Sequence, residues 1–154
     1  MSENHIEKAC RSFAEGRNCS QAVVAAFNDL TGLSDDLSLR LSSSFGGGMG
    51  RMREVCGAVS GMFMVIGMLY GYTDKDNDEK KAEHYKRIQQ LAKEFTAVHG
   101  TINCGELLKE LNVNKNHVPE KRTEQYYKTR PCVRFVETAA EIIERYIAEN
   151  PLED

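Results

Sequence analysis

The middle of the chain holds the feature that most constrains its fold, a long stretch without charge. Residues 55–72 carry only apolar, small or uncharged side chains. Eighteen such residues approach the minimum length of a membrane span, and Arg51 and Arg53 would suit its cytoplasmic flank. A helix that other helices surround is also apolar on every side. We therefore predict a buried, glycine-rich central helix and no membrane span.

Glycines recur in this stretch at helical spacing. Gly57 and Gly61 stand four positions apart, as do Gly67 and Gly71. Residues four apart share one face of a helix, and a face without side chains lets a second helix approach closely. We expect both pairs to contact neighbouring helices.

The segments around the central stretch have the apolar periodicity of amphipathic helices. We predict helices over residues 3–15 and 19–31, a short helix that begins after Ser34, a long helix over 76–98, a short helix from 103 to 111, and a final helix that begins at Pro131. Residues 112–129 are polar and are predicted to be an irregular connection. No segment alternates as a strand would. Residues 1–154 should form one all-α domain, a compact bundle of about six to seven helices.

Two of these helices have faces that we assign to the interior. In the short helix after Ser34, the apolar positions are Leu37 and Leu41. The stripe of the 76–98 helix consists of Ala82, Tyr85, Ile88, Leu91, Phe95 and Val98. Both sets should pack against the central helix.

Composition excludes several classes of function. The net charge is −3 and no long basic run occurs, so the chain lacks the positive surface of a nucleic-acid-binding protein. The N-terminus has no charged-then-apolar signal pattern, and we expect a cytoplasmic protein. In a reducing compartment its five cysteines should act as thiols, metal ligands or a redox set rather than as structural disulfides.

Four of the cysteines share one position, the first turn of a predicted helix. They are Cys19, Cys56, Cys104 and Cys132. A helix N-terminus offers unpaired N–H groups and the positive end of the helix dipole, which favour the reactive thiolate. The shared placement predicts that at least two of these thiols form one site. Cys10 lies in the middle of a helix, and we interpret it as a core residue.

The spacing of the four cysteines excludes the short-motif sites. No Cys-x-x-Cys occurs, which argues against a zinc ribbon, a thioredoxin-type pair and a c-type haem. Alternate helices of a bundle start at the same end, so Cys19, Cys56 and Cys104 could converge. Cys132 could join them only if residues 112–129 run back along the bundle.

A glycine-rich loop precedes the central helix. Residues 45–53 read FGGGMGRMR, and their backbone N–H groups could cradle an anion. We favour a second interpretation, in which the glycines let the backbone turn tightly beside Cys56. Arg51 and Arg53 would then support a thiolate electrostatically.

Three short sequences together resemble the C_GCAxxG_C_C family of bacterial and archaeal proteins regarded as redox-active. They are NCSQAV at 18–23, FGGGMGR at 45–51 and CGAVSG at 56–61, followed by lone cysteines at 104 and 132. The family name expects glycine before the second cysteine, where this chain has Val55. Some members are similar to part of split-Soret cytochromes, which carry an iron–sulfur centre, and many lie near transporter genes. The resemblance therefore implies a thiol or cluster role but no defined activity.

Our leading hypothesis is a thiol-based redox protein. Cys56, beside Gly57 and Gly61 and supported by Arg51 and Arg53, would be the attacking thiolate. Cys19 would be the resolving partner, and Cys104 and Cys132 would form a second pair or further members of the site. The partner would be a redox protein or a small-molecule substrate, and a homodimer is a further expectation.

Two alternatives from other classes stay open. All four cysteines could hold zinc or an iron–sulfur cluster, since four thiolates meet either requirement. The chain could also be a non-catalytic helical adaptor, for instance for a transporter, in which the thiols only pack.

Overall fold

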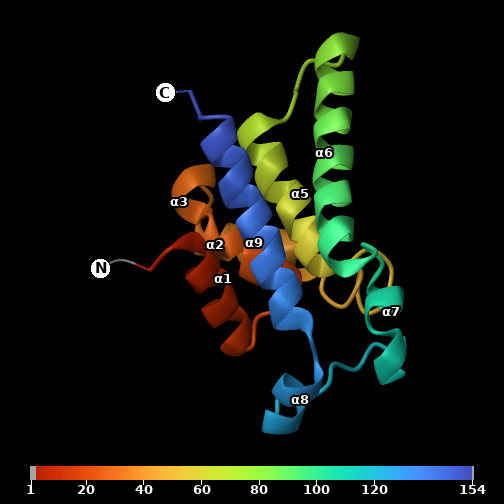
Figure 1. The fold of residues 1–154 in the computed structure, drawn as a ribbon. Helices are drawn as coiled ribbons and strands as arrows, with labels where there is room; N and C mark the ends of the chain where they lie inside the picture. Colours follow the sequence, from red (N-terminus) through yellow and green to blue (C-terminus); the bar gives the residue numbers. More distant parts are fainter. Residues whose placement is uncertain (1–2, 154) are drawn as a thin grey trace.

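The computed structural model describes residues 3–153, so Met1, Ser2 and Asp154 of the predicted domain lie outside the described residues. Within that range the helices are α1 (His5–Ala14), α2 (Cys19–Ala26), α3 (Asn28–Thr31), α4 (Asp35–Ser43), α5 (Gly57–Tyr70), α6 (Asp78–His99), α7 (Cys104–Leu107), η1 (Lys109–Leu111), α8 (Glu124–Thr129) and α9 (Cys132–Glu149). Figure 1 shows α5, α6 and α9 side by side along the molecule, with α7 and α8 at one end. The all-α prediction is confirmed.

Local capping signals explain most of the helix boundaries. Asn18, Ser34 and Asn103 each accept a hydrogen bond from a backbone N–H group in the first turn of the helix that follows, which satisfies a donor without an intrahelical partner. Pro131 precedes α9, as predicted. Gly100, with φ of 90°, ends α6 in the left-handed conformation that glycine adopts most readily.

Two predicted segments differ from the structure. The helix expected over 19–31 breaks at Phe27 into α2 and α3, because Phe27 leaves helical geometry and its ring is completely buried. The connection expected over 112–129 contains the short helix α8, which Thr123 caps through the N–H group of Tyr126.

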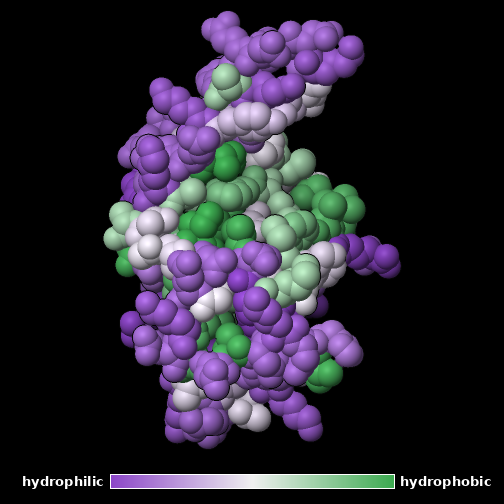
Figure 2. Space-filling view, turned by 90° about the vertical axis from the view of Figure 1, so that its right-hand side faces the viewer, coloured by the Kyte–Doolittle hydropathy of each residue, from purple (hydrophilic) through white to green (hydrophobic). Residues whose placement is uncertain are grey.

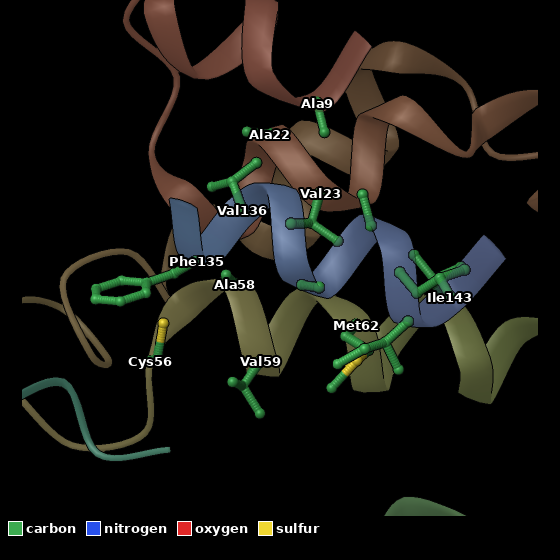
Figure 3. Close-up of a cluster of buried hydrophobic side chains, with 14 of the residues drawn as sticks. Ala9, Ala22, Val23, Cys56, Ala58, Val59, Met62, Phe135, Val136 and Ile143 are labelled. Carbon is green, nitrogen blue, oxygen red and sulfur yellow. The ribbon is translucent and has the colours of Figure 1, made fainter. Parts of the chain in front are cut away.

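The central helix α5 is buried along its first half. Gly57 to Met62, Val65 and Ile66 are all buried, and α5 packs against both α2 and α9, which Figure 3 shows close to one another around the buried side chains. The far end is less enclosed, since Met68 is 52% exposed. Among residues 3–153, no helix is long and apolar enough to cross a membrane.

Only one of the two glycine pairs makes a close helix contact. A Cβ atom on Gly57 would lie 2.4 Å from the Cys19 sulfur, and one on Gly61 would lie 3.0 Å from the Ser20 carbonyl oxygen. These two glycines therefore let α5 approach α2. A Cβ atom on Gly67 would meet nothing within 4 Å, so the prediction for Gly67 and Gly71 was wrong.

The inward face of α4 is also not the predicted one. Leu37 and Leu41 are 46% and 53% exposed, whereas Ser38 and Ser42 are completely buried. Each serine hydroxyl donates to a carbonyl of its own helix, so it is satisfied without a partner in the core. Small side chains on this face let α4 lie close to α2.

The apolar stripe of α6 is packed only in part. Leu91 and Phe95 are completely buried, but Tyr85 is 52% and Val98 63% exposed. Figure 1 shows that the N-terminal end of α6 extends beyond the other helices, which accounts for Tyr85 but not for Val98 near the C-terminal end. Figure 2 shows apolar surface gathered between hydrophilic ends on the side of the molecule where α6 lies.

Candidate functional site

The four cysteines line one cavity of about 280 Å³. Cys19, Cys104 and Cys132 are the first residues of α2, α7 and α9, and Cys56 immediately precedes α5. The predicted position of each cysteine at a helix start is therefore confirmed. All four helix starts border the cavity. They include the start of α9 at Cys132, whose position could not be predicted from the sequence because it depends on the path of the connection before α9.

A short backbone pairing brings Cys56 and Cys104 together. Val55 and Asn103 form an isolated antiparallel bridge. The N–H group of Cys56 donates to Ile102 at 2.7 Å, and that of Cys104 donates to Glu54 at 2.6 Å. The chain segments that carry these two thiols are therefore held in fixed register.

Cys19 lies against the start of α5. Its helix begins with a capping box in which Asn18 and Gln21 exchange side-chain and backbone hydrogen bonds. The missing side chain of Gly57 leaves the room that the Cys19 sulfur occupies. Gly57 therefore belongs to the wall of the cavity through packing.

Arginines tie the connection before α9 to the cavity. Arg122 donates to the carbonyl oxygens of Phe13 at 3.0 Å and Arg17 at 2.9 Å, and its guanidinium carbon lies 4.3 Å from the Phe13 ring centroid. Arg53 donates to the carbonyl of Asn114 at 2.9 Å. These bonds bring residues 112–131 back to the site and place Cys132 there.

The glycine-rich loop makes an unusual left-handed turn. Residues 47–51 all have φ between 56° and 75°, and Arg53 has φ of 62°. Met49, Arg51 and Arg53 adopt this conformation although each carries a Cβ atom, at a cost of about 1–2 kcal/mol per residue. Such strain is typical of functional sites.

The turn is tight, as predicted, but it lies against a different cysteine. A Cβ atom on Gly48 would be 2.6 Å from the Cβ atom of Cys104. The N–H groups of residues 49–54 donate to carbonyl oxygens of residues 44–49. These six donors are therefore occupied within the loop, which weakens the interpretation that they cradle an anion.

Burial changes the pKa of three thiols more than the N–H groups at the helix starts do. Burial, followed by the charge of Cys19, raises the pKa of Cys56 well above its usual value, although the N–H groups of Ala58 and Val59 act in the opposite direction. No side-chain capping bond forms there. Burial also raises the pKa of Cys104 and raises that of Cys132 to about 12. The expectation that helix starts would lower these pKa values was wrong, because desolvation disfavours the thiolate more strongly.

Cys19 is electrostatically central to the set. Its charge is among the causes that raise the pKa of each of the other three thiols. Cys19 is also half-buried, whereas Cys56 is 4% and Cys104 6% exposed. A reactant that enters the cavity therefore reaches Cys19 more easily than either of those two.

Arg53 is the most enclosed charged side chain of the site. It is 6% exposed. Its Nη1 atom lies 3.8 Å from the Cys104 sulfur, and the guanidinium lowers the pKa of that thiol against the larger effect of burial. The predicted electrostatic role of Arg53 therefore applies to Cys104. Within residues 3–153, its buried Nη2 atom has no hydrogen-bond partner.

Three further charged residues of the lining share one network. Arg51 and Arg130 both pair with Glu120, at 3.4 Å for Arg51. Arg51 also donates to Asn116 and Val118. Glu120 and Arg122 belong to residues 112–129, which were predicted to be an irregular connection, and Arg130 follows that segment directly. The sequence marks these three residues only by the high density of charged side chains around them. A solvent-exposed loop has the same high density, so it does not indicate a functional site.

The arrangement does not assemble a metal site. In the described part of the chain, no group of three or more His, Cys, Asp or Glu side chains is placed to hold a metal ion. All five cysteines are free thiols. A four-thiolate zinc or iron–sulfur site would require the sulfurs to move together. Cys10 lies outside the cavity in α1, where burial raises its pKa.

The comparisons with known proteins give one match. The model of the family described as "Putative redox-active protein (C_GCAxxG_C_C)" matches residues 17–146. This range contains all four cysteines of the cavity and the glycine-rich loop. No curated protein and no solved structure matches the chain.

Proposed function

We propose that this chain, which belongs to the C_GCAxxG_C_C family, performs thiol–disulfide exchange at its four-cysteine cavity. The observation that supports this function is the convergence of four thiols from four separate helix starts on one cavity. Cysteines that serve only as small core residues have no need of a common solvent-reachable space. The arrangement also differs from an adaptor, in which buried thiols would be scattered through the core.

Cys19 is the attacking thiol in this proposal, and Cys56 is the resolving one. Cys56 and Cys104 are buried, and burial raises the pKa of Cys132 to about 12. The roles are thus the reverse of those expected from the sequence, where Cys56 was the attacking residue. Attack by the Cys19 thiolate on a disulfide R–S–S–R forms a mixed disulfide and releases one R–S⁻, which takes up a proton.

The second step resolves the mixed disulfide. Burial is the larger cause of the raised pKa of Cys56, and the charge of a Cys19 thiolate is the second cause. Formation of the mixed disulfide removes only the second cause, and the Cys56 thiol then loses its proton and attacks the Cys19 sulfur. The second R–S⁻ leaves and is protonated, so that two thiol groups of the protein are oxidised and one disulfide is reduced to two thiols.

Trapping the mixed disulfide tests these roles. Reduced protein is mixed with a limiting amount of 2-hydroxyethyl disulfide, quenched with iodoacetamide and mapped by peptide mass spectrometry. We expect the adduct on Cys19, its accumulation in Cys56→Ser, and its loss in Cys19→Ser. Cys10→Ser is the matched control and should react as the unchanged chain does. Equal reaction of Cys19→Ser and the unchanged chain would contradict the assignment.

The metal alternative has its own test. Because all four cysteines line the same cavity, a rearrangement that gathers the sulfurs would provide four thiolate ligands. Protein purified without oxygen should then contain bound zinc or iron, with a visible spectrum in the case of iron. Colourless, metal-free protein that forms reversible disulfides would leave thiol exchange as the function.

A further inference from the structure

Arg53, which lines the cavity, carries a buried hydrogen-bond donor that no atom of the described chain satisfies. The Nη2 atom of Arg53 is buried and has no partner within residues 3–153, and the side chain is more than nine-tenths buried. Its other nitrogens contact the Asn114 carbonyl and the Cys104 sulfur. Buried polar groups in native proteins are nearly always hydrogen-bonded, and a buried cation without a partner is costly. A ligand with an acceptor oxygen at this place would remove that cost.

The charge of the lining indicates the sign of the ligand. Four arginines line the cavity, and among residues 3–153 Glu120 is the only carboxylate in the lining. Glu120 already pairs with Arg51 and Arg130. Because burial raises the pKa values of Cys104 and Cys132, these thiols do not supply the missing negative charge at pH 7. The site therefore retains an excess of positive charge that attracts an anion.

The size and the apolar part of the lining indicate an organic anion. A volume of about 280 Å³ is much larger than the roughly 30 Å³ that one water molecule occupies in the liquid. Phe13, Leu107 and Phe135 line the same space, and these side chains favour carbon rather than the hydration shell of an inorganic ion. Guanidinium groups in such surroundings pair well with carboxylates.

We propose that the cavity binds a low-molecular-weight disulfide whose halves carry carboxylate groups, with Arg53 Nη2 donating to one carboxylate. This inference rests on the proposed function and names its substrate class. Arg53 lies beside Cys104 and lines the same cavity as Cys19, so the anchored carboxylate holds the sulfur–sulfur bond within the set of thiols. Cys19 attacks, one carboxylate-bearing thiol leaves with a proton, and attack by Cys56 releases the other, as in the exchange described above.

A series of three disulfides that differ in charge tests the inference. The reduced protein is mixed with dithiodiglycolate, which is anionic, with 2-hydroxyethyl disulfide, which is neutral, and with cystamine, which is cationic. The rate of thiol loss is corrected for the reactivity of each disulfide with a small thiol. We expect the anionic compound to react at least about tenfold faster than the neutral one, as for one charge-assisted hydrogen bond. Cystamine should be the slowest.

Variants separate the binding arginine from charge in general. Arg53→Gln should remove most of the preference for dithiodiglycolate, while the neutral disulfide still reacts. Arg40→Gln is the matched control, because Arg40 is an exposed residue on α4 that does not line the cavity, and it should keep the preference. Circular dichroism verifies that both variants are folded.

A binding measurement that needs no exchange covers the case in which Arg53→Gln does not fold. Adipate has the length and both carboxylates of dithiodiglycolate but no sulfur. It should slow the labelling of Cys19 by neutral iodoacetamide in the unchanged chain, whereas 1,6-hexanediol should not. Equal corrected rates for the three disulfides, or no protection by adipate, would overturn the substrate class. No reaction with any disulfide would instead overturn the proposed function.

Discussion

Alanine at position 57 should destabilise the protein, although alanine is the better helix residue. The added Cβ atom would lie 2.4 Å from the Cys19 sulfur and 2.7 Å from the Phe45 carbonyl oxygen. The first distance is about an ångström shorter than the closest comfortable contact between such atoms. The second neighbour is backbone and cannot move away by rotation of a side chain.

The expected magnitude follows from two opposing effects. Overpacking of a close-packed site costs about 1–3 kcal/mol. The helix-propensity gain of alanine over glycine is at most about 1 kcal/mol, and it is smaller here because Gly57 is the first residue of α5. Gly57→Ala should therefore lower the free energy of unfolding by about 0.5–2.5 kcal/mol. The Cys19 sulfur would also be displaced, so exchange should slow.

The same helix offers a matched control. Gly67 lies inside α5, and a Cβ atom there would meet nothing within 4 Å. Gly67→Ala should therefore stabilise the protein by up to about 1 kcal/mol. Urea unfolding under reducing conditions, followed by far-ultraviolet circular dichroism, measures both variants. If Gly57→Ala were as stable as Gly67→Ala, the close approach of α2 and α5 would not have the role assigned to it.

Three other consequences can be measured separately. Burial raises the pKa of Cys132 from an unfolded value near 9 to about 12, so the unfolded chain loses this proton at a lower pH than the folded chain does. The free energy of unfolding should therefore fall as pH rises from about 9 to 12. Urea titrations should show a smaller fall for Cys132→Ala. Arg122→Met removes the hydrogen bonds to the carbonyl oxygens of Phe13 and Arg17 and should lower the free energy of unfolding by about 1–3 kcal/mol. Proteolysis within residues 112–123 should be faster, and unchanged digestion would show that these bonds do not hold the segment in place. Asn103→Ala removes the cap of α7 and should lower the free energy of unfolding by about 1 kcal/mol. Iodoacetamide should then label Cys104 faster than in the unchanged chain, and an equal rate of labelling would contradict this prediction.

Local sequence signals predicted the helices and the place of each cysteine well. A cap such as Asn18 or Ser34 acts on N–H groups within three residues of it, so it can be recognised without knowledge of the fold. Charge-free length likewise identified α5 as the buried helix. The inward face of α4 could not be recognised in this way. Ser38 and Ser42 face α2 because their small side chains allow a closer approach, and Leu37 and Leu41 are exposed instead.

Features that depend on distant segments were missed. The pairing of Val55 with Asn103 joins residues 48 positions apart, and nothing in either segment alternates as a strand would. The buried state of Arg53 depends on the left-handed turn before it and on Asn114 beyond it. For the same reason, the acidity of the thiols was predicted from the helix starts alone, without the desolvation that tertiary packing imposes.

If the four thiols around one cavity exchange as proposed, their number also sets how many electrons the site can give up. Each disulfide removes two electrons, so a set of four cysteines has a fully reduced state, a state with one disulfide and a state with two. The half-oxidised state retains two thiols beside a disulfide, so it can give two electrons to an external disulfide or take two electrons from an external dithiol. A chain with this property would act as a small two-step electron reservoir, whereas a single cysteine pair can only be full or empty.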